Sequence, residues 1–225
     1  MPLKRLFDTQ VKTTRAKRER RKEARPGELL QAALDLFVEK GFAATRSEEV
    51  AARAGVSKGT LFLYFPSKEE LFKAVVRENI SGRFSQWNDE FVQFSGTTAD
   101  MLHTCMDIWW TRVGATQASG ISKLMLGEAC NFPELAAFYR QEVVQPGHAL
   151  LARIVQRGID SGEFRAVDAS QTAFSVVASM VFVMMQRHTG GVCVPADTSF
   201  DPIAFLHHQV DLMVRGLQTH APEAS

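Results

Sequence analysis

Cysteine is scarce in this chain, and its scarcity excludes a fold built on disulfides. The three cysteines, Cys105, Cys130 and Cys193, are odd in number and widely spaced, unlike the bridged framework of a small secreted domain. No basic motif adjoins any of them, so thiol-based sensing stays open without positive support. The N-terminal basic residues are not followed by an apolar stretch, so we expect no secretory signal and a cytoplasmic protein.

Long apolar runs and catalytic motifs are also missing. The longest apolar, helix-compatible run without a charged residue, Ala173–Met185, is shorter than the roughly 20 residues that cross a bilayer, so we expect a buried core helix and no membrane partner. The P-loop, HExxH, GxSxG and CxxC patterns do not occur. His207 and His208 are adjacent, and on a helix they point about 100° apart, so they do not readily share a metal. We expect no enzyme, no metal and no cofactor.

The net charge of +1 hides an asymmetry along the chain. Residues 1–68 carry 15 Lys and Arg against 8 Asp and Glu, whereas residues 69–225 carry 11 against 17. A basic N-terminal part indicates a polyanionic partner at one end of the protein, although a charged tail exposed to solvent would have the same excess of basic residues. Residues 1–25 contain little that could fill a core, so we expect a basic flexible arm there.

The remaining sequence has the apolar spacing of an all-α protein. We see neither alternating strands nor a fixed repeat. Thr45 with Glu48 has the spacing of a capping box, Ser57 and Ser67 can cap the next two helices, and Asp168 and Asp201 can cap the last two. The expected helices lie over 26–41, 45–54, 57–66, 67–94, 102–113, around 124–125, over 133–159 with a kink at Pro146, and over 168–188 and 201–217.

The helix at 67–94 would be roughly 40 Å long and would link two regions. The three short helices before it form the arrangement that inserts one helix into the major groove of DNA. We therefore expect a helix-turn-helix domain over 26–72 and a larger helical domain for ligand binding and dimerisation over 73–225.

The run from Leu30 to Leu71 resembles the DNA-binding domain of the TetR/AcrR family of transcriptional regulators. The resemblance extends over about forty residues without a gap, whereas the rest of the chain matches that family only in helix count and pattern. The matching residues are Phe37, Gly41, Thr45, Val50-Ala51, Ala54-Gly55-Val56-Ser57, Gly59-Thr60-Leu61, Phe62, Tyr64-Phe65 and Ser67-Lys68-Glu69.

The start of the third helix carries the expected contacts to bases. Gly59 leaves the backbone bare for close approach to DNA. Lys58 and Thr60 stand at the end of the helix that reaches base edges, where Lys58 can donate to guanine and the Thr60 methyl can touch thymine. Ser57 and Thr45 lie at expected helix N-termini suited to phosphate, although Thr45 can equally be a plain cap.

The resemblance implies further phosphate contacts from Arg46, Tyr64 and Lys68. Phe62 belongs to the same DNA-binding set but departs from the family, which usually has a tyrosine there, so a phenolic phosphate contact is lost. Val50, Leu61 and Phe65 have the spacing of core residues of the small domain.

The larger domain is expected to bind a second subunit and a small molecule. Reading a palindromic operator requires two recognition helices and hence a homodimer, for which the last two long helices are the candidates, unless they only complete a monomer core. A pocket for a small, largely apolar or aromatic effector is expected among the other helices. Its candidate lining residues, each of which can also be simple core, are His103, Met106, Trp109, Trp110, Met125, Phe138, Tyr139, Met180 and Met184.

These features together favour a cytoplasmic transcriptional repressor that leaves its double-stranded DNA operator when the effector binds. Three alternatives stay open: control by a protein partner, control by thiol oxidation, and a nonspecific architectural DNA-binding protein. The last alternative explains the basic arm but does not require a large acidic helical body.

Removal of residues 1–24 tests the arm. Because Lys and Arg on phosphates release counterions, the shortened protein is expected to bind an operator more weakly and with a flatter dependence on salt concentration. Fluorescence anisotropy over a salt series measures both quantities. An unchanged salt slope would mean that the arm makes no contact with DNA.

Overall fold

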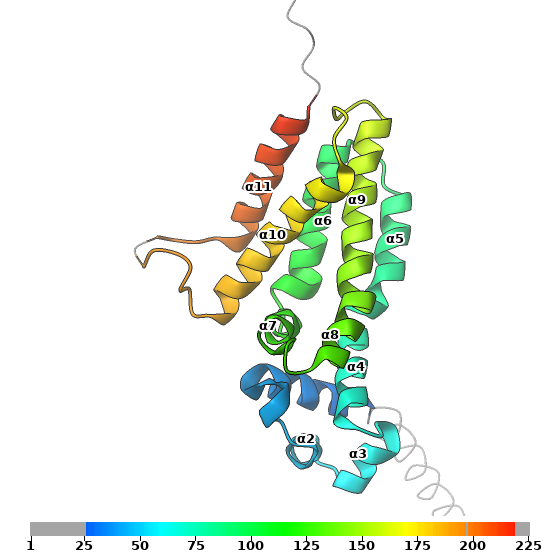
Figure 1. Cartoon of the computed structure of the whole chain (residues 1–225), viewed down its shortest axis with the longest axis vertical. Coiled ribbons are helices and arrows are strands. Elements are labelled where there is room, and N and C mark those ends of the chain that lie inside the picture. Colours follow the sequence, from blue (N-terminus) through cyan, green and yellow to red (C-terminus); the bar gives the residue numbers. More distant parts are fainter. Residues whose placement is uncertain (1–25, 197, 219–225) are drawn as a thin grey trace, which may run out of the picture. The chain divides into compact units, whose positions relative to one another are not determined.

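The computed structural model describes residues 26–196 and 198–218, and the chain divides into two compact units at Val75 and Val76. The arm expected at 1–25 lies outside the described residues. Helices dominate both units (Figure 1), and the described residues contain no strand beyond one isolated antiparallel bridge between Phe164 and Gln218. The all-α prediction is therefore confirmed.

The first unit is a small bundle built around three phenylalanine rings. It contains a helical segment over residues 26–44, α2 (Ser47–Arg53), α3 (Lys58–Tyr64) and the start of α4 (Lys68–Asn79). The rings of Phe37, Phe42 and Phe72 are fully buried, with centroids 5.4–5.6 Å apart. Such aromatic contacts stabilise beyond the burial of area alone, so this trio fixes how the first helix and α4 pack.

The start of α2 differs from the expectation. The predicted capping box of Thr45 and Glu48 is wrong by one residue: Arg46 is the N-cap, and its backbone N–H donates to Glu49 over 3.3 Å. Thr45 is buried, and its hydroxyl donates to the carbonyl oxygens of Leu36 (3.1 Å) and Gly41 (2.7 Å). Thr45 thus closes the end of the first helix and does not cap the second.

The two serine caps are confirmed. The Thr60 N–H donates to Ser57 Oγ over 3.1 Å at the start of α3, and the Glu70 N–H donates to Ser67 Oγ over 3.1 Å at the start of α4. Gly55 has a φ of 66° in the turn between α2 and α3, a conformation that glycine adopts without strain. Local turn chemistry therefore sets the direction of α3.

The predicted single helix over 67–94 is wrong. Helix α4 ends at Asn79, a 3₁₀ turn covers Ser81–Arg83, and α5 (Phe84–Val92) follows. A Cβ on Gly82 would lie 2.7 Å from the carbonyl oxygen of Arg77, so the chain turns where only glycine fits against the end of α4. The apolar spacing runs through this break, which is why the sequence did not reveal it.

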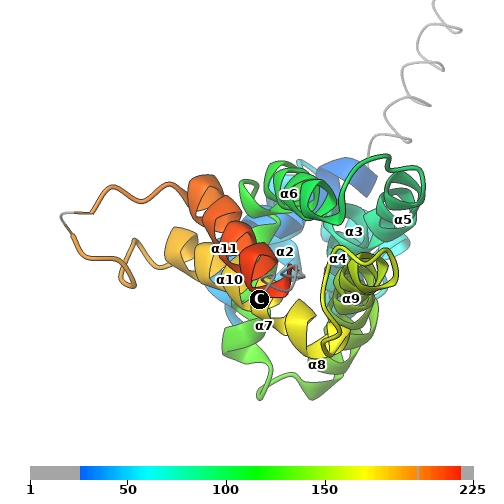
Figure 2. The ribbon, with the colours of Figure 1, turned by 90° about the horizontal axis from the view of Figure 1, so that it is seen from above.

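The second unit packs its long helices around a common core. Helix α9 contacts α5, α6 and α10, and α11 contacts α6 and α10. Residues 189–196 and 198–201 loop away from the bundle in both views (Figures 1 and 2). The elements after α5 are α6 (Thr98–Trp109), a π turn (Trp110–Gly114), α7 (Ser119–Glu128), α8 (Pro133–Tyr139), a second π turn (Arg140–Val144), α9 (Gln145–Asp160), α10 (Ala169–His188) and α11 (Pro202–Leu217).

The helical path from Pro133 to Asp160 is continuous past Pro146, as expected. The irregularity takes the form of the π turn over Arg140–Val144, in which the Gln145 N–H donates to the Arg140 carbonyl five residues back. Because proline supplies no N–H to the preceding turn, a widened turn accommodates it without ending the helix. The expected caps at Asp168 and Asp201 are also confirmed.

Helix α10 is less covered than expected. The sequence predicted a buried core helix, but only Ala173, Val176, Val183 and Met184 are buried along its twenty residues, and Phe174 is 51% exposed. Among the described residues, α10 is the one helix long and apolar enough to cross a membrane by length and composition alone. Such a helix also suits contact with another protein surface.

The beginning of α6 is held by Glu163, which precedes α10. Its carboxylate accepts hydrogen bonds from the Thr98 N–H (2.5 Å) and the Thr98 hydroxyl (2.9 Å), and Arg157 donates to the same hydroxyl over 2.8 Å. Burial acts to raise the pKa of Glu163, but the bonds from Thr98 and Ser161 and the charge of Arg157 hold that pKa below its usual value. The network joins the first turn of α6 to the end of α9.

Replacement of Glu163 by Gln is expected to lower the free energy of unfolding by about 1–2 kcal/mol, because hydrogen bonds to a charged acceptor are lost. The advantage of the wild type is complete above the unfolded pKa of the carboxyl and disappears as the pH falls through the lowered folded pKa. Urea unfolding at several pH values measures both effects. Asp89→Asn, at an exposed position of α5, is the control, and equal losses in the two variants would contradict this assignment.

Candidate nucleic-acid interface and effector cavity

Helix α3 presents one exposed face in the first unit. Lys58, Gly59, Phe62 and Leu63 are exposed, and their spacing places them on one side of the helix, while Leu61 on the other side is fully buried. Leu63 is 85% exposed. Sequence reasoning missed it, although its position outside the phase of the buried residues was a usable signal.

Lys58 carries the exposed positive charge of this face. Its ammonium lies 2.5 Å from Glu48 Oε1 and 5.7 Å from the centroid of the Phe62 ring. The hydrogen bond from Lys58 is the main reason why the pKa of Glu48 is lowered. Since both side chains are more than half exposed, water competes strongly with the pair. Lys58 can therefore exchange Glu48 for another acceptor.

Two of the expected phosphate contacts are occupied within the unit. The Lys68 ammonium donates to the backbone carbonyls of Phe42 (2.8 Å) and Thr45 (3.0 Å) and lies 4.4 Å from the Phe42 ring centroid. Thr45 is buried with its hydroxyl engaged. Both side chains hold the link between the first helix and α2, so their expected role as free phosphate donors requires correction.

The other candidates remain at or near the surface. Arg46 and Ser57 are exposed, and Tyr64 and Thr60 are half-buried. A Cβ built on Gly59 would meet only Ser57 Oγ, at 3.8 Å. The fold itself therefore does not require glycine at this position, and any requirement for it must come from a partner.

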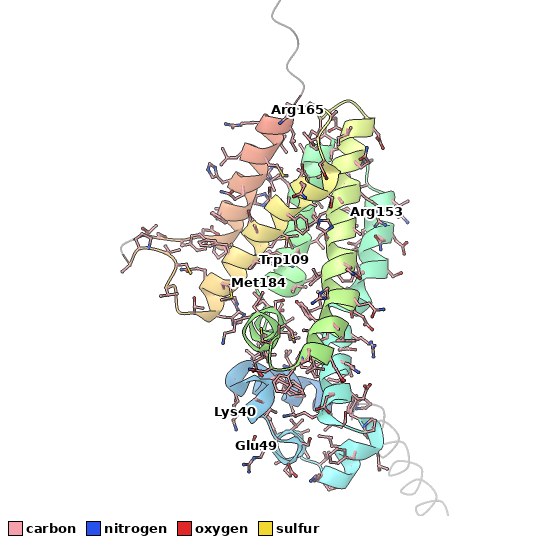
Figure 3. All side chains as sticks on the ribbon, in the orientation of Figure 1. Lys40, Glu49, Trp109, Arg153, Arg165 and Met184 are labelled. Carbon is pink, nitrogen blue, oxygen red and sulfur yellow. The ribbon has the colours of Figure 1, made fainter. Side chains whose placement is uncertain are left out.

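The second unit contains an apolar cavity of about 500 Å³. Four of the residues expected to line an effector pocket do line it: Trp109, Met125, Tyr139 and Met184. Trp109, at the end of α6, and Met184, in α10, are labelled in Figure 3 and both line the cavity. The remaining wall comes from α5, α7, α8, the second π turn, α9 and α10.

The other expected lining residues lie elsewhere, which corrects that part of the prediction. Met106 lines a separate hollow of about 330 Å³ between α10 and α11, and Phe138 lies under the Arg77 guanidinium at 5.0 Å from its ring centroid. Trp110 and Met180 pack against the buried core. These side chains share the apolar stripe but not the cavity.

His103 belongs to a polar cluster that joins α6 to α11. Its Nδ1 lies 2.6 Å from Nδ1 of His207, and its Nε2 lies 3.1 Å from Asp211. Nε2 of His207 lies 2.8 Å from Asp107. Each helix supplies a histidine and an aspartate four residues apart, a repeated spacing that could have revealed the cluster from sequence. His103 is therefore an interhelical contact and not a cavity residue.

Trp109 and Trp110 both lie close to Gly114. A Cβ on that glycine would meet both rings, at 3.0 Å from Trp109 and 2.4 Å from Trp110. The π turn that follows α6 ends at this glycine and brings both rings over it. Only Trp109 reaches the cavity.

Several cavity residues were missed from the sequence. The positions Ala136, Tyr139, Val143, Gly147 and Leu151 lie three or four residues apart along the path through α8 and α9, and all line the cavity. This is the spacing of one helical face. Polar lining residues missed in the same way are Ser122, Arg140 and His148.

Three polar groups lie in the wall away from solvent. The hydroxyl groups of Ser122 and Tyr139 form a hydrogen bond of 2.7 Å, and burial raises the pKa of Tyr139 to about 12. The phenol therefore stays neutral at physiological pH. Trp87 is 5% exposed, and its indole N–H has no hydrogen-bond partner among the described residues. Among the described residues, no group of His, Cys, Asp and Glu is arranged to hold a metal ion.

Models of two protein families match the two units of the chain. Residues 29–75 match "Bacterial regulatory proteins, tetR family", and residues 95–192 match "Tetracyclin repressor-like, C-terminal domain". These are families of regulatory proteins and not of enzymes.

Curated relatives match either the first unit or most of the chain. The HTH-type transcriptional regulator RutR of Escherichia coli is 53% identical over 68 residues, which is 30% of this chain and about a third (32%) of the relative. The fatty acid metabolism regulator protein of Bacillus subtilis is 23% identical over 205 residues, covering 87% of this chain and 98% of the relative.

Solved structures share the fold over most of the chain. A putative transcriptional regulator from Saccharomonospora viridis in complex with choline has a TM-score of 0.71 at 19% identity, covering 88% of this chain and 100% of that one. FadR from Bacillus subtilis in complex with stearoyl-CoA has a TM-score of 0.66 at 20% identity, covering 85% and 98%. With family models matched in both units and this fold throughout, the chain belongs to the TetR family of bacterial transcriptional regulators.

Proposed function

We propose that this protein is a repressor that binds a palindromic operator as a homodimer and is released by a small, largely apolar or aromatic ligand. In this assignment residues 1–25 form a basic arm, 26–72 the DNA-binding domain and 73–225 the domain for ligand binding and dimerisation. The observation that carries the proposal is the exposed face of α3, where a bare glycine stands beside a lysine and two apolar side chains.

The expected division of contacts follows from this face. Lys58 leaves Glu48 to donate to a base edge, and Thr60 and Leu63 offer apolar contact to thymine methyl groups. Arg46, Ser57 and Tyr64 bind phosphates and set the position of the helix. Phe62 supplies apolar contact at the edge of the same face.

The homodimer is proposed to form through α10 and α11. Phe174 and Leu212 are each 51% exposed, and only 22% of the most apolar window of α10 is buried in a single chain. A second copy of the same two helices would cover these side chains symmetrically. Two recognition helices then face half-sites about one helical turn apart.

The cavity is proposed as the effector site of a protein that works in the bacterial cytoplasm. Two structures of the same fold are complexes with stearoyl-CoA and with choline, chemically different ligands, so the fold alone does not fix the effector. Glu142 lies in the same π turn as the lining residues Arg140 and Val143 but outside the lining itself, and its carboxylate accepts hydrogen bonds from Arg77 at the end of α4 (3.0 Å from Nε). A ligand that changes this wall would bias α4 and thereby the DNA-binding domain.

DNA binding is tested by selection of bound genomic fragments, followed by affinity measurements on the selected operator. Gly59→Ala is expected to leave folding unchanged, because nothing obstructs its Cβ, but to weaken operator binding at least tenfold by blocking close approach. Gly127→Ala in α7, also unobstructed, is the control and should bind normally.

Two results would contradict this proposal. Equal binding to the selected operator and to scrambled DNA of the same length would favour the architectural alternative. Equal operator affinity in Gly59→Ala and wild type would remove α3 from the interface.

Control by thiol oxidation is tested by the reactivity of the cysteines. Burial raises the pKa of Cys105 to about 12, so this thiol is expected to resist iodoacetamide in the native protein, whereas the exposed Cys130 and Cys193 react. Mass spectrometry of native and unfolded samples locates the label. Loss of operator binding after mild peroxide treatment, prevented by Cys130→Ser and Cys193→Ser together, would support the thiol alternative instead.

A further inference from the structure

The polar groups that line the cavity include a positive charge but no negative charge. The residues that line it, all of them described in the structure, include no Asp and no Glu. They include one guanidinium, that of Arg140, together with the hydroxyl groups of Ser122 and Tyr139 and the rings of Trp87 and His148. The wall therefore offers positive charge and hydrogen-bond donors without any carboxylate to balance them.

Arg140 is a charged lining residue whose guanidinium is not neutralised by a carboxylate of the described residues. It is exposed at the start of the π turn over Arg140–Val144, and it forms no ion pair with the described residues. The neighbouring arginines do have partners: Arg77 binds Glu142, and Arg112 binds Glu90 over 3.0 Å. An arginine at the edge of an apolar cavity is well placed to bind a carboxylate or a phosphate, since its planar fork matches both.

Deeper in the wall, further hydrogen-bond donors are unused, beside the acceptor lone pairs of the two hydroxyl groups. The indole N–H of Trp87 is buried without a partner among the described residues, which is costly unless a ligand supplies an acceptor. The Ser122–Tyr139 hydrogen bond uses only one of the two hydroxyl hydrogens. His148 meets the Ser170 carbonyl through Nε2 at 3.0 Å, so that nitrogen is already engaged.

From these groups we propose that the effector is a singly charged anionic amphiphile, with its carboxylate bound by Arg140 and its apolar body inside the cavity. This inference rests on the proposed role of the cavity as the effector site and adds the charge of the ligand. A single unpaired guanidinium matches one negative charge. The aromatic wall formed by Phe84, Trp87 and Trp109 would suit a quaternary ammonium by cation–π attraction, but Arg140 repels such a head and no carboxylate attracts it.

The charge of the head group is tested with probes that share one apolar chain. Octanoate, octanol, octyltrimethylammonium and octyl phosphate are titrated into the full-length protein by calorimetry. Octanoate is expected to bind about tenfold more tightly than octanol, as one charge-assisted hydrogen-bonded pair implies, and the ammonium is expected to bind most weakly. Octyl phosphate separates a general anion site from a carboxylate site: tighter binding than octanoate would overturn the carboxylate assignment.

Variants at Arg140 assign the preference to this side chain. Arg140→Gln is expected to bring octanoate down to the affinity of octanol without changing octanol binding, and Arg140→Lys is expected to restore part of the difference. Arg187→Gln, an exposed arginine of α10 outside the cavity wall, should keep the full preference. A preference for octanoate that persists in Arg140→Gln would overturn the proposal, as would equal or tighter binding of octanol or the ammonium, or no binding of any probe.

Operator binding in the same samples separates this inference from the proposed function. If octanol releases the operator as well as octanoate does, the cavity is an effector site but its head-group selectivity is not anionic. If the ligand-free protein shows no operator preference at all, the proposed function fails whatever the probes do.

Discussion

The carboxylate of Glu142 is the contact on which the arrangement of the second unit around its cavity depends. It accepts hydrogen bonds from Arg77 in α4 and from Ser81 just after α4, and the Phe138 ring packs against the same guanidinium. Glu142 itself lies in the π turn whose neighbours Arg140, Val143 and Val144 line the cavity. One ion pair therefore joins the end of α4 to the π turn that contributes to the cavity wall.

Interruptions of regular helix create that wall. Gly82 lets the chain leave α4 against the carbonyl of Arg77, so that Phe84 and Trp87 follow on a separate helix. Their rings lie edge to face with centroids 5.1 Å apart, and Phe84 lies 3.5 Å from the position that a Cβ on Gly147 would occupy. An uninterrupted helix would carry these rings in another direction. The cavity thus depends on glycine and π turns as much as on its large side chains.

The helix caps were predictable from the sequence, whereas the points at which long helices break were not. The caps at Ser57, Ser67, Asp168 and Asp201 follow from side chains acting on backbone groups two or three residues away, so spacing predicts them. The break after α4 depends on the fit of Gly82 against the Arg77 carbonyl, and the separation of lining residues from core residues depends on packing between distant helices. Apolar spacing is the same for both, and for this reason His103, Met106 and Met180 were placed in the cavity.

The Lys58–Glu48 pair bears on the base contact proposed for Lys58. The ammonium is paired with an exposed carboxylate and lies over the Phe62 ring, 5.7 Å from its centroid. The same carboxylate repels phosphate, which disfavours nonspecific contact of this lysine with the DNA backbone. Because water screens the pair, its loss costs little when a guanine replaces it. Selectivity at this position would then come from a repulsive neighbour as well as from an attractive contact.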